Sequence, residues 1–200
     1  MGMQHTEAYD SPPSFPTRPF QQSTDRVGAF LVAHFGFIFT VIIGLLLAVA
    51  FIDPILSFLG LDAIAKPLFN SMHLMCAQIP SHSFYLFGHQ VCLCERCCAI
   101  YGSMFLSGLA FVFSKKRLPG IPWWLWVLMI LPMAWDGTTQ MFGWRESTWI
   151  LRTVTGTLFG LGSVWFVLPL IHKTLMEDLA RMPAPLAAKI PPIQEGRNTL

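Results

Sequence analysis

Long apolar runs separated by short polar segments are the main pattern of this chain. The runs cover about residues 27–52, 97–114, 122–142 and 149–171. A bilayer core about 30 Å thick needs about 20 helical residues, and each run is close to that length. No run alternates as a barrel strand would, and a helical bundle satisfies its backbone hydrogen bonds internally. The pattern therefore predicts an all-α membrane protein that forms a bundle of four transmembrane helices.

The polar segments set the expected boundaries of this bundle. Residues 1–26 are rich in Pro, Ser and Gln and contain no apolar run, so we expect a disordered tail there. Asp53 and Pro54 are expected to end the first helix. We therefore predict a membrane domain over residues 27–175, followed by a C-terminal tail over residues 176–200.

Composition supports the bilayer as the environment of the chain. The sequence is 54% hydrophobic and 12% charged, whereas soluble chains carry about 25% charged residues. This apolar excess requires lipid contact. The net charge of +2 is too small to indicate nucleic acid as a partner.

Basic residues indicate the orientation. Lys115, Lys116 and Arg117 stand between the second and third runs, and further basic residues precede the first run and follow the fourth. Cytoplasmic segments carry an excess of Lys and Arg. We therefore expect a multi-pass protein of the bacterial inner (plasma) membrane with both termini cytoplasmic. The long segment between the first two runs then becomes an extracytoplasmic loop.

That predicted loop is rich in cysteine and histidine. All five cysteines lie within residues 71–98, together with three of the six histidines. Zinc takes four thiolate or imidazole ligands in a tetrahedron, and Cys-x-x-Cys is a common chelating spacing. The sequence therefore predicts a zinc-type metal site with the ligands Cys76, Cys94, Cys97 and His82. The alternatives for the fourth ligand are His73, His89 and Cys92.

Two other interpretations of these cysteines stay open. Disulfides persist outside the cytoplasm, and a helix N-terminus with Arg96 beside it would favour the thiolates of Cys94 and Cys97. The pair could therefore form a redox-active or structural dithiol. Cys92 and Cys98, which stand among apolar residues, could instead be buried small side chains.

A second polar group is expected at the same membrane side. Asp136 stands about two-thirds of the way along the third run, a costly depth for a carboxylate. Gln140 shares its helix face, while Arg145 and Arg152 follow in the next loop and helix. One interpretation is a structural ion pair of Asp136 with Arg145 or Arg152. The other is a catalytic group bordering the cysteine site, in which Asp136 acts as acid or base.

Small residues in the fourth run predict close helix packing. Gly156 and Gly160 have the small-x-x-x-small spacing that lets two membrane helices approach. We expect the partner to be a neighbouring helix of the same bundle.

Two sequence blocks resemble a known family. The first runs from Cys76 through CAQIPSHSF and FGHQ to CERCCAIY, and the second comprises DGTTQMFGWREST and RTVTGTLFG. They resemble the prokaryotic integral membrane proteins grouped as domain of unknown function 2085, over roughly residues 65–170. Ala77 and His82 stand where the family pattern has His and Arg, so His82 or His73 could replace a ligand at position 77. The resemblance implies the fold and the place of the site rather than an activity.

Two functions are consistent with this reading. The first is an accessory or structural subunit of a larger membrane complex, with a metal or dithiol site at its outer face. The second is a membrane-embedded enzyme, metal- or thiol-dependent, that acts at the outer leaflet with Asp136 as acid or base. In it, Arg145 or Arg152 would bind an anionic headgroup.

Overall fold

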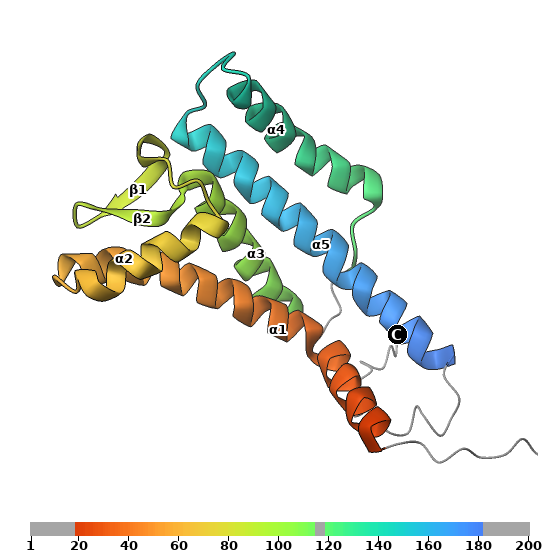
Figure 1. Cartoon of the computed structure of the whole chain (residues 1–200). Helices are drawn as coiled ribbons and strands as arrows, with labels where there is room; N and C mark the ends of the chain where they lie inside the picture. Colours follow the sequence, from red (N-terminus) through yellow and green to blue (C-terminus); the bar gives the residue numbers. More distant parts are fainter. Residues whose placement is uncertain (1–18, 115–118, 182–200) are drawn as a thin grey trace, which may run out of the picture.

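The computed structural model describes residues 19–114 and 119–181, and most of these residues are helical. The helices are α1 (Pro19–Phe58), α2 (Asp62–Ser71), α3 (Glu95–Phe113), α4 (Trp123–Met141) and α5 (Trp149–Arg181). The strands β1 (Ser83–Leu86) and β2 (His89–Cys94) pair into a hairpin. Two short 3-10 turns, η1 (Met72–Leu74) and η2 (Pro80–His82), precede this hairpin. Figure 1 shows the hairpin and α2 at the end of the molecule where α3 and α5 begin.

Three of these helices have the length and hydropathy of membrane spans, not four. They are His34–Phe58, Glu95–Phe113 and Trp149–Thr174. The helix α4 occupies the predicted third span, but Asp136, Thr138, Thr139 and Gln140 make its second half polar. The described part of the chain therefore confirms a largely helical protein with three candidate spans.

The helix α4 nevertheless lies along α5. The amide of Ile121, just before α4, donates to the carbonyl oxygen of Trp165 at 3.5 Å. Within the helices, the ring of Trp126 stacks on Phe166 with 4.7 Å between centroids. At the other end of α4, Ser147 Oγ donates to Asp136 Oδ2 at 3.0 Å. The two helices are thus antiparallel neighbours, and α4 returns the chain to the hairpin end (Figure 1).

Several predicted helix ends were wrong. The first helix continues through Asp53 and Pro54 to Phe58. Proline has no N–H group to donate, yet the helical pattern goes on, with Leu59 N donating to Ile55 O at 3.0 Å. Asp53 is buried, and it lines a cavity together with residues of α2 and β2. At the termini, α1 already begins at Pro19 and α5 extends to Arg181, while residues 1–18 and 182–200 lie outside the described residues.

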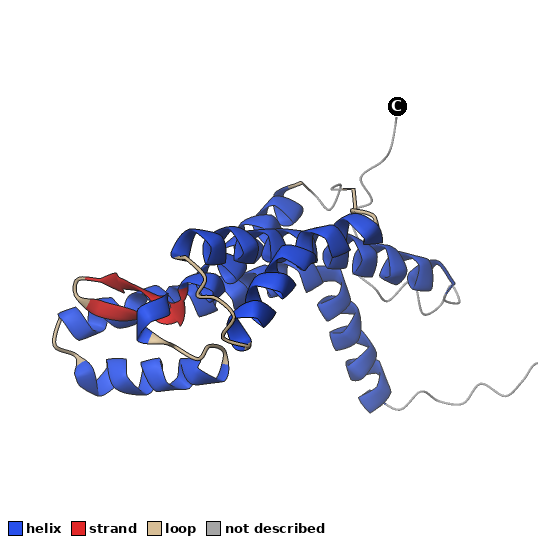
Figure 2. Ribbon diagram, turned by 90° about the horizontal axis from the view of Figure 1, so that it is seen from above, coloured by secondary structure: helices blue, strands red, loops and turns tan. Residues whose placement is uncertain are grey.

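The predicted extracytoplasmic loop contains regular structure, so the all-α prediction is incomplete. The hairpin is antiparallel and pairs Tyr85 with Gln90 and Leu86 with His89. Phe87 and Gly88 both have positive φ, 53° and 83°, as a two-residue type I′ turn requires. The apolar residues of β2 pack with Ala50 of α1 and with Cys76. Figure 2 shows the strands lying against the helices.

The contact between α3 and α5 depends on small residues, as predicted. A Cβ atom at Gly160 would collide with Ser103 Oγ and lie 2.5 Å from the carbonyl oxygen of Ile100. A Cβ at Gly156 would lie 2.8 Å from the carbonyl oxygen of Arg96. The glycines therefore let the two backbones approach closely. This contact brings the N-terminal turns of α3 and α5 together.

Candidate metal centre and its charged surroundings

Three cysteine sulfur atoms form a compact cluster. The Sγ atoms of Cys76, Cys94 and Cys97 all lie within 4.8 Å of one another. Cys76 follows η1, Cys94 ends β2, and Cys97 lies in the first turn of α3. Tetrahedral zinc with Zn–S bonds of about 2.3 Å places its sulfur ligands about 3.8 Å apart. The cluster therefore has the compactness of a metal site without rearrangement of the fold.

Backbone amides point at the sulfur of Cys76. The amide of Cys94 donates to this Sγ at 3.2 Å and the amide of Gln78 at 3.5 Å. Hydrogen bonds from the thiols of Cys94 and Cys97 lower the pKa of Cys76 further, whereas its bond to Cys76 raises the pKa of Cys94. These hydrogen bonds favour the thiolate form of Cys76. The thiolate is the form of cysteine that binds metal ions.

Gln78 organises the segment around Cys76, a role that sequence reasoning missed. Its buried side-chain amide donates to the carbonyl oxygens of Phe69 at 2.8 Å and Cys92 at 2.9 Å. The backbone carbonyl oxygen of Gln78 accepts a hydrogen bond from Gln90 Nε2 at 2.8 Å. Its φ of 51° is unusual for glutamine. Gln78 therefore ties α2 and β2 to the chain that carries Cys76, and nothing in its residue type indicated the left-handed conformation.

A cavity of about 510 Å³ opens beside the cysteine cluster. The three cysteines share its wall with His82, Arg96, Gln140 and Arg152. His82 lies outside the group of atoms within 4.8 Å of one another. Burial lowers the pKa of His82, which favours the neutral imidazole that can coordinate a metal.

Asp136 of α4 is the centre of a buried ion-pair network. It is 1% exposed and accepts from Arg96 Nη2 and, at 2.7 Å, from Arg145 Nη2. Ser147 Oγ donates to it as well, at 3.0 Å. Arg96 also donates to Gln140 Oε1 at 3.0 Å. The predicted pairing of Asp136 with Arg145 is confirmed.

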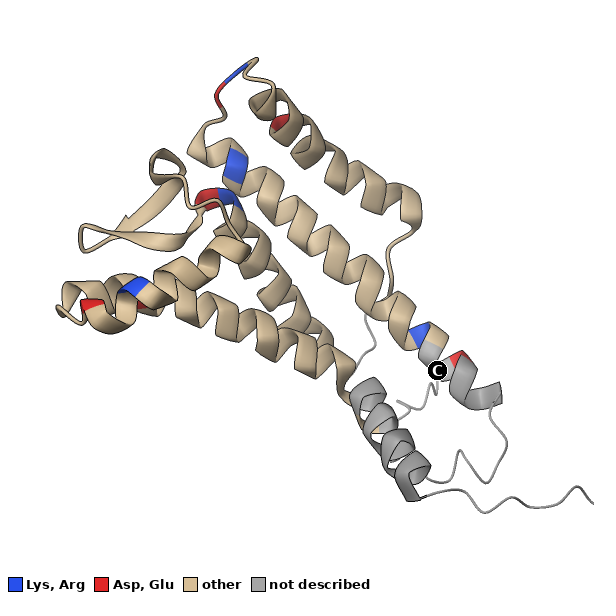
Figure 3. Ribbon diagram, in the orientation of Figure 1, with Lys and Arg blue, Asp and Glu red and all other residues tan. Residues whose placement is uncertain are grey.

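Arg152 has a different partner from the one considered in the sequence. Its Nη1 lies 3.0 Å from Glu95 Oε2, and both side chains are nearly buried. The pairing of Asp136 with Arg152 was therefore wrong. Glu95 and Arg96 stand between Cys94 and Cys97, and because successive helical residues point about 100° apart, each reaches a different helix. Figure 3 shows these charges at the start of α3 and α5.

Comparison with known proteins identifies the family. Residues 76–166 match the model of a family described as predicted membrane protein, DUF2085. The chain is also 34% identical over 134 residues to an uncharacterised protein of Methanocaldococcus jannaschii, covering 62% of this chain and 85% of that protein. This chain belongs to the DUF2085 family. A second archaeal protein, from Methanothermobacter thermautotrophicus, is 32% identical over 101 residues, which are 50% of this chain and 91% of that protein. No solved structure matches this DUF2085 chain.

The other predicted ligands of this DUF2085 protein are not among the described atoms that lie within 4.8 Å of one another at the sulfur cluster. The ring of His73 contacts Phe69 edge-on, with 6.3 Å between centroids, and His89 lines a different cavity. Cys92 is fully buried, and burial raises its pKa. Cys98 directs its thiol at the carbonyl oxygen of Leu93 at 3.5 Å. All five cysteines are free thiols in the structure.

Proposed function

We propose that this DUF2085 protein carries a zinc-type metal centre at its hairpin end. The thiolates of Cys76, Cys94 and Cys97 would be three ligands, with the fourth position toward the cavity that His82 borders. The observation that carries this proposal is the approach of the three sulfur atoms to within 4.8 Å. Soft thiolate ligands in a tetrahedral arrangement favour zinc over magnesium or calcium.

We propose a structural or accessory role for this centre, as part of a subunit of a larger membrane complex. Asp136 supports this role because two guanidinium groups and a hydroxyl fill its acceptor positions. A carboxylate held in this way locks helices together rather than exchanging protons. With His82 as fourth ligand the centre would be closed, as structural zinc sites are.

The cavity favours a second candidate, a metal-dependent enzyme acting at the outer leaflet. Zinc enzymes keep one coordination position open for water or substrate. Here a space of about 510 Å³ adjoins the cysteines, and Arg96 and Arg152 line it. In this case His82 would stay off the metal. The coordination of the bound metal therefore discriminates between the two candidates.

The proposed topology has four spans with both termini in the cytoplasm. The position of α4 along α5 supports a fourth crossing, since 19 helical residues extend about 28 Å. Lys173, which lies toward the end of α5 away from the hairpin, supports the orientation. We propose a prokaryotic plasma membrane. The sequence pointed to a bacterial one, whereas the two relatives reported above are archaeal.

The orientation can be tested by labelling intact cells with a membrane-impermeant maleimide. The exposed positions Ser81, in η2, and Lys173, toward the other end of α5, are suitable. Ser81→Cys should be labelled from outside and Lys173→Cys only after lysis. The reverse pattern would overturn the proposed orientation.

Metal analysis of the purified protein tests the metal centre. Wild type and Cys98→Ser should each contain about one zinc per chain, and Cys97→Ser should contain very little. Cys98 is the matched control because it is the next residue in α3 and outside the sulfur cluster. Negligible metal in all three proteins would refute the proposal. Alkylation of the thiols without reductant then shows whether a disulfide has formed instead.

A further inference from the structure

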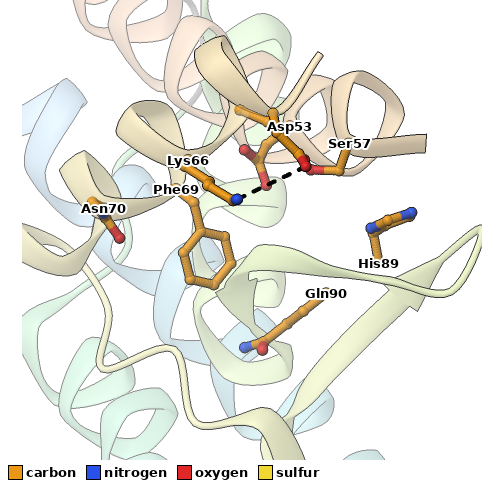
Figure 4. Close-up of a pocket in the computed structure, with 9 residues that line it drawn as sticks. Asp53, Ser57, Lys66, Phe69, Asn70, His89 and Gln90 are labelled. Carbon is orange, nitrogen blue, oxygen red and sulfur yellow. Dashed lines mark ion pairs between the residues drawn. The ribbon is translucent and has the colours of Figure 1, made fainter. Parts of the chain in front are cut away.

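A second cavity, of about 410 Å³, lies between α1, α2 and β2. It shares no lining residue with the cavity beside the cysteine cluster. Figure 4 shows side chains from all three elements around it, including Asp53 and Ser57 of α1, Lys66 of α2 and His89 of β2. Seven of its nine lining residues are polar or charged.

Asp53 is the unusual member of this lining. Its side chain is 2% exposed, and its Oδ1 atom has no hydrogen-bond partner in the structure. The Cys92 thiol hydrogen-bonds to this carboxylate, but Asp53 takes part in none of the ion pairs found among the described residues. A buried carboxylate without a counter-ion is costly. The ionised form of Asp53 therefore lacks an ion-pair partner among the described residues.

The lysine at the cavity wall is not such a partner. Lys66 pairs with Asp62 at 3.8 Å, and both side chains are largely exposed. Two carboxylates and one ammonium group line the cavity. Its formal charge is thus −1 with His89 neutral, which suits a ligand with a single positive charge.

The arrangement suits an ammonium group better than a metal ion. Among the described residues, Asp53, Asp62 and His89 do not form a group whose ligand atoms lie within 4.8 Å of one another. Gln90 uses its amide nitrogen in bonds to Gln78 O and Ser83 Oγ, so its carbonyl oxygen is the group available to a ligand. Separated acceptors of this kind match the three N–H donors of a primary ammonium group.

We propose that this cavity binds a primary ammonium group, with the Asp53 carboxylate as its counter-ion. The group can come from the headgroup of an aminophospholipid or from a small soluble amine. The cavity lies at the end of the candidate span His34–Phe58, where headgroups are expected. The proposal does not depend on metal at the cysteine cluster.

The test uses the full-length protein in nanodiscs with equal amounts of phosphatidylethanolamine and phosphatidylcholine. The two headgroups have the same phosphate and positive charge, but methylation removes all three N–H donors from choline. Native mass spectrometry should show wild type retaining the ethanolamine lipid about tenfold over the choline lipid. Asp53→Asn should abolish this preference. Glu177→Gln is the matched control, because Glu177 forms an exposed pair with Lys173 outside this cavity, and it should keep the preference.

A second arm separates the two sources of the amine. Glycerophosphoethanolamine, which has the headgroup without acyl chains, is added to protein in phosphatidylcholine nanodiscs. A rise in the unfolding temperature that Asp53→Asn removes identifies a small soluble amine as sufficient. No rise, together with selective lipid retention, identifies the aminophospholipid. Both results support the ammonium site.

Three results would overturn the proposal. They are equal retention of both lipids by wild type, an ethanolamine preference that survives Asp53→Asn, and Asp53-dependent stabilisation by Zn²⁺ or Mg²⁺ but by no amine. Circular dichroism checks that Asp53→Asn keeps the helical content of wild type. If it does not, Ser57→Ala, which removes one acceptor and no charge, should lower the lipid preference about threefold, and an unchanged preference would refute the site.

Discussion

The two cavities differ in whether the buried carboxylates near them have ion-pair partners within the described chain. Arg96 and Arg152 line the cavity beside the cysteines. Arg96 pairs with Asp136, which also pairs with Arg145, and Arg152 pairs with Glu95. In the cavity between α1, α2 and β2, Asp53 has no ion-pair partner within the described chain. The first arrangement needs no ligand to compensate its charges. The second is complete only with a cation.

The difference follows from the helices that meet at each cavity. The ion pairs of the first cavity join α3 to α4 and to α5, so their arginines and carboxylates come from different helices. The second cavity is built by α1, α2 and β2, and the basic residue in its wall, Lys66, lies one turn from Asp62. Because Lys66 pairs with Asp62 of its own helix, Asp53 of α1 is left without an ion-pair partner among the described residues. Internal compensation therefore distinguishes a structural polar network from a ligand site in this fold.

The largest expected effect comes from neutralising Asp136, the buried carboxylate that has ion-pair partners. Asp136→Asn removes the counter-charge of the mostly buried Arg96 and of the more exposed Arg145, so it should lower the free energy of unfolding by about 3–5 kcal/mol. Chemical unfolding in nanodiscs, followed by circular dichroism, measures this loss. Asp62→Asn is the control, because an exposed pair contributes at most about 1 kcal/mol. Equal losses in both variants would contradict a structural role for Asp136.

The second prediction concerns the close packing of α5 on α3 beside the cysteine cavity. Gly160→Ala should lower the free energy of unfolding by about 1–3 kcal/mol, because the added Cβ must push α5 away from the α3 backbone. Gly102→Ala is the matched control, since a Cβ there meets nothing within 4 Å. It should be neutral or stabilising by up to about 1 kcal/mol. The same unfolding assay compares them, and a larger loss at Gly102 would refute the packing argument.

The third prediction concerns the hydrogen bonds that hold Cys76 in place. Gln78→Ala removes the amide that bridges Phe69 and Cys92, and should weaken zinc affinity about 10–100-fold. Competition with a chromogenic chelator measures the affinity. Ser81→Ala, an exposed position in the same segment, should leave it unchanged. An unaltered affinity in Gln78→Ala would show that the cluster does not depend on this residue.

The smallest effect is expected at the uncompensated carboxylate. In phosphatidylcholine nanodiscs, which supply no N–H donor, Asp53→Asn should leave stability unchanged or raise it by up to about 1 kcal/mol. The same substitution at Asp136 therefore has the opposite sign. Unfolding both variants side by side tests the comparison. A loss of several kcal/mol at Asp53 would mean that an internal partner compensates its charge.

Hydrophobic runs predicted the helices well because lipid contact requires such runs. The predicted spans 97–114 and 122–142 correspond to Glu95–Phe113 and Trp123–Met141. The end of α1 was missed because Asp53 and Pro54 read as a helix stop. Whether they stop it depends on the packing of the folded chain, in which Asp53 is buried and lines a cavity with residues of α2 and β2. The hairpin was missed because its strands are short and follow no clean alternation.

The cysteine spacing indicated where the candidate metal site lies, but it did not indicate which charged side chains pair around that site. The pair Cys94 and Cys97 could be read from the sequence, and Cys76 joins them because β2 returns the chain toward η1. The pairings of Asp136 with Arg96 and of Arg152 with Glu95 could not be predicted, because they depend on how α3 is rotated against α4 and α5. Gln78 was missed for a similar reason, since its role lies in a backbone conformation that only the folded chain defines.

The X-ray absorption spectrum of the zinc-loaded protein at the zinc edge tests the metal centre most directly. The account predicts three sulfur scatterers at about 2.3 Å and one nitrogen or oxygen scatterer at about 2.0 Å. An imidazole signature that His82→Ala removes would identify the closed, structural form, whereas an oxygen ligand would identify the open one. A shell with fewer than three sulfur atoms would contradict a centre built by Cys76, Cys94 and Cys97, whereas a fourth sulfur atom would show that another cysteine completes it.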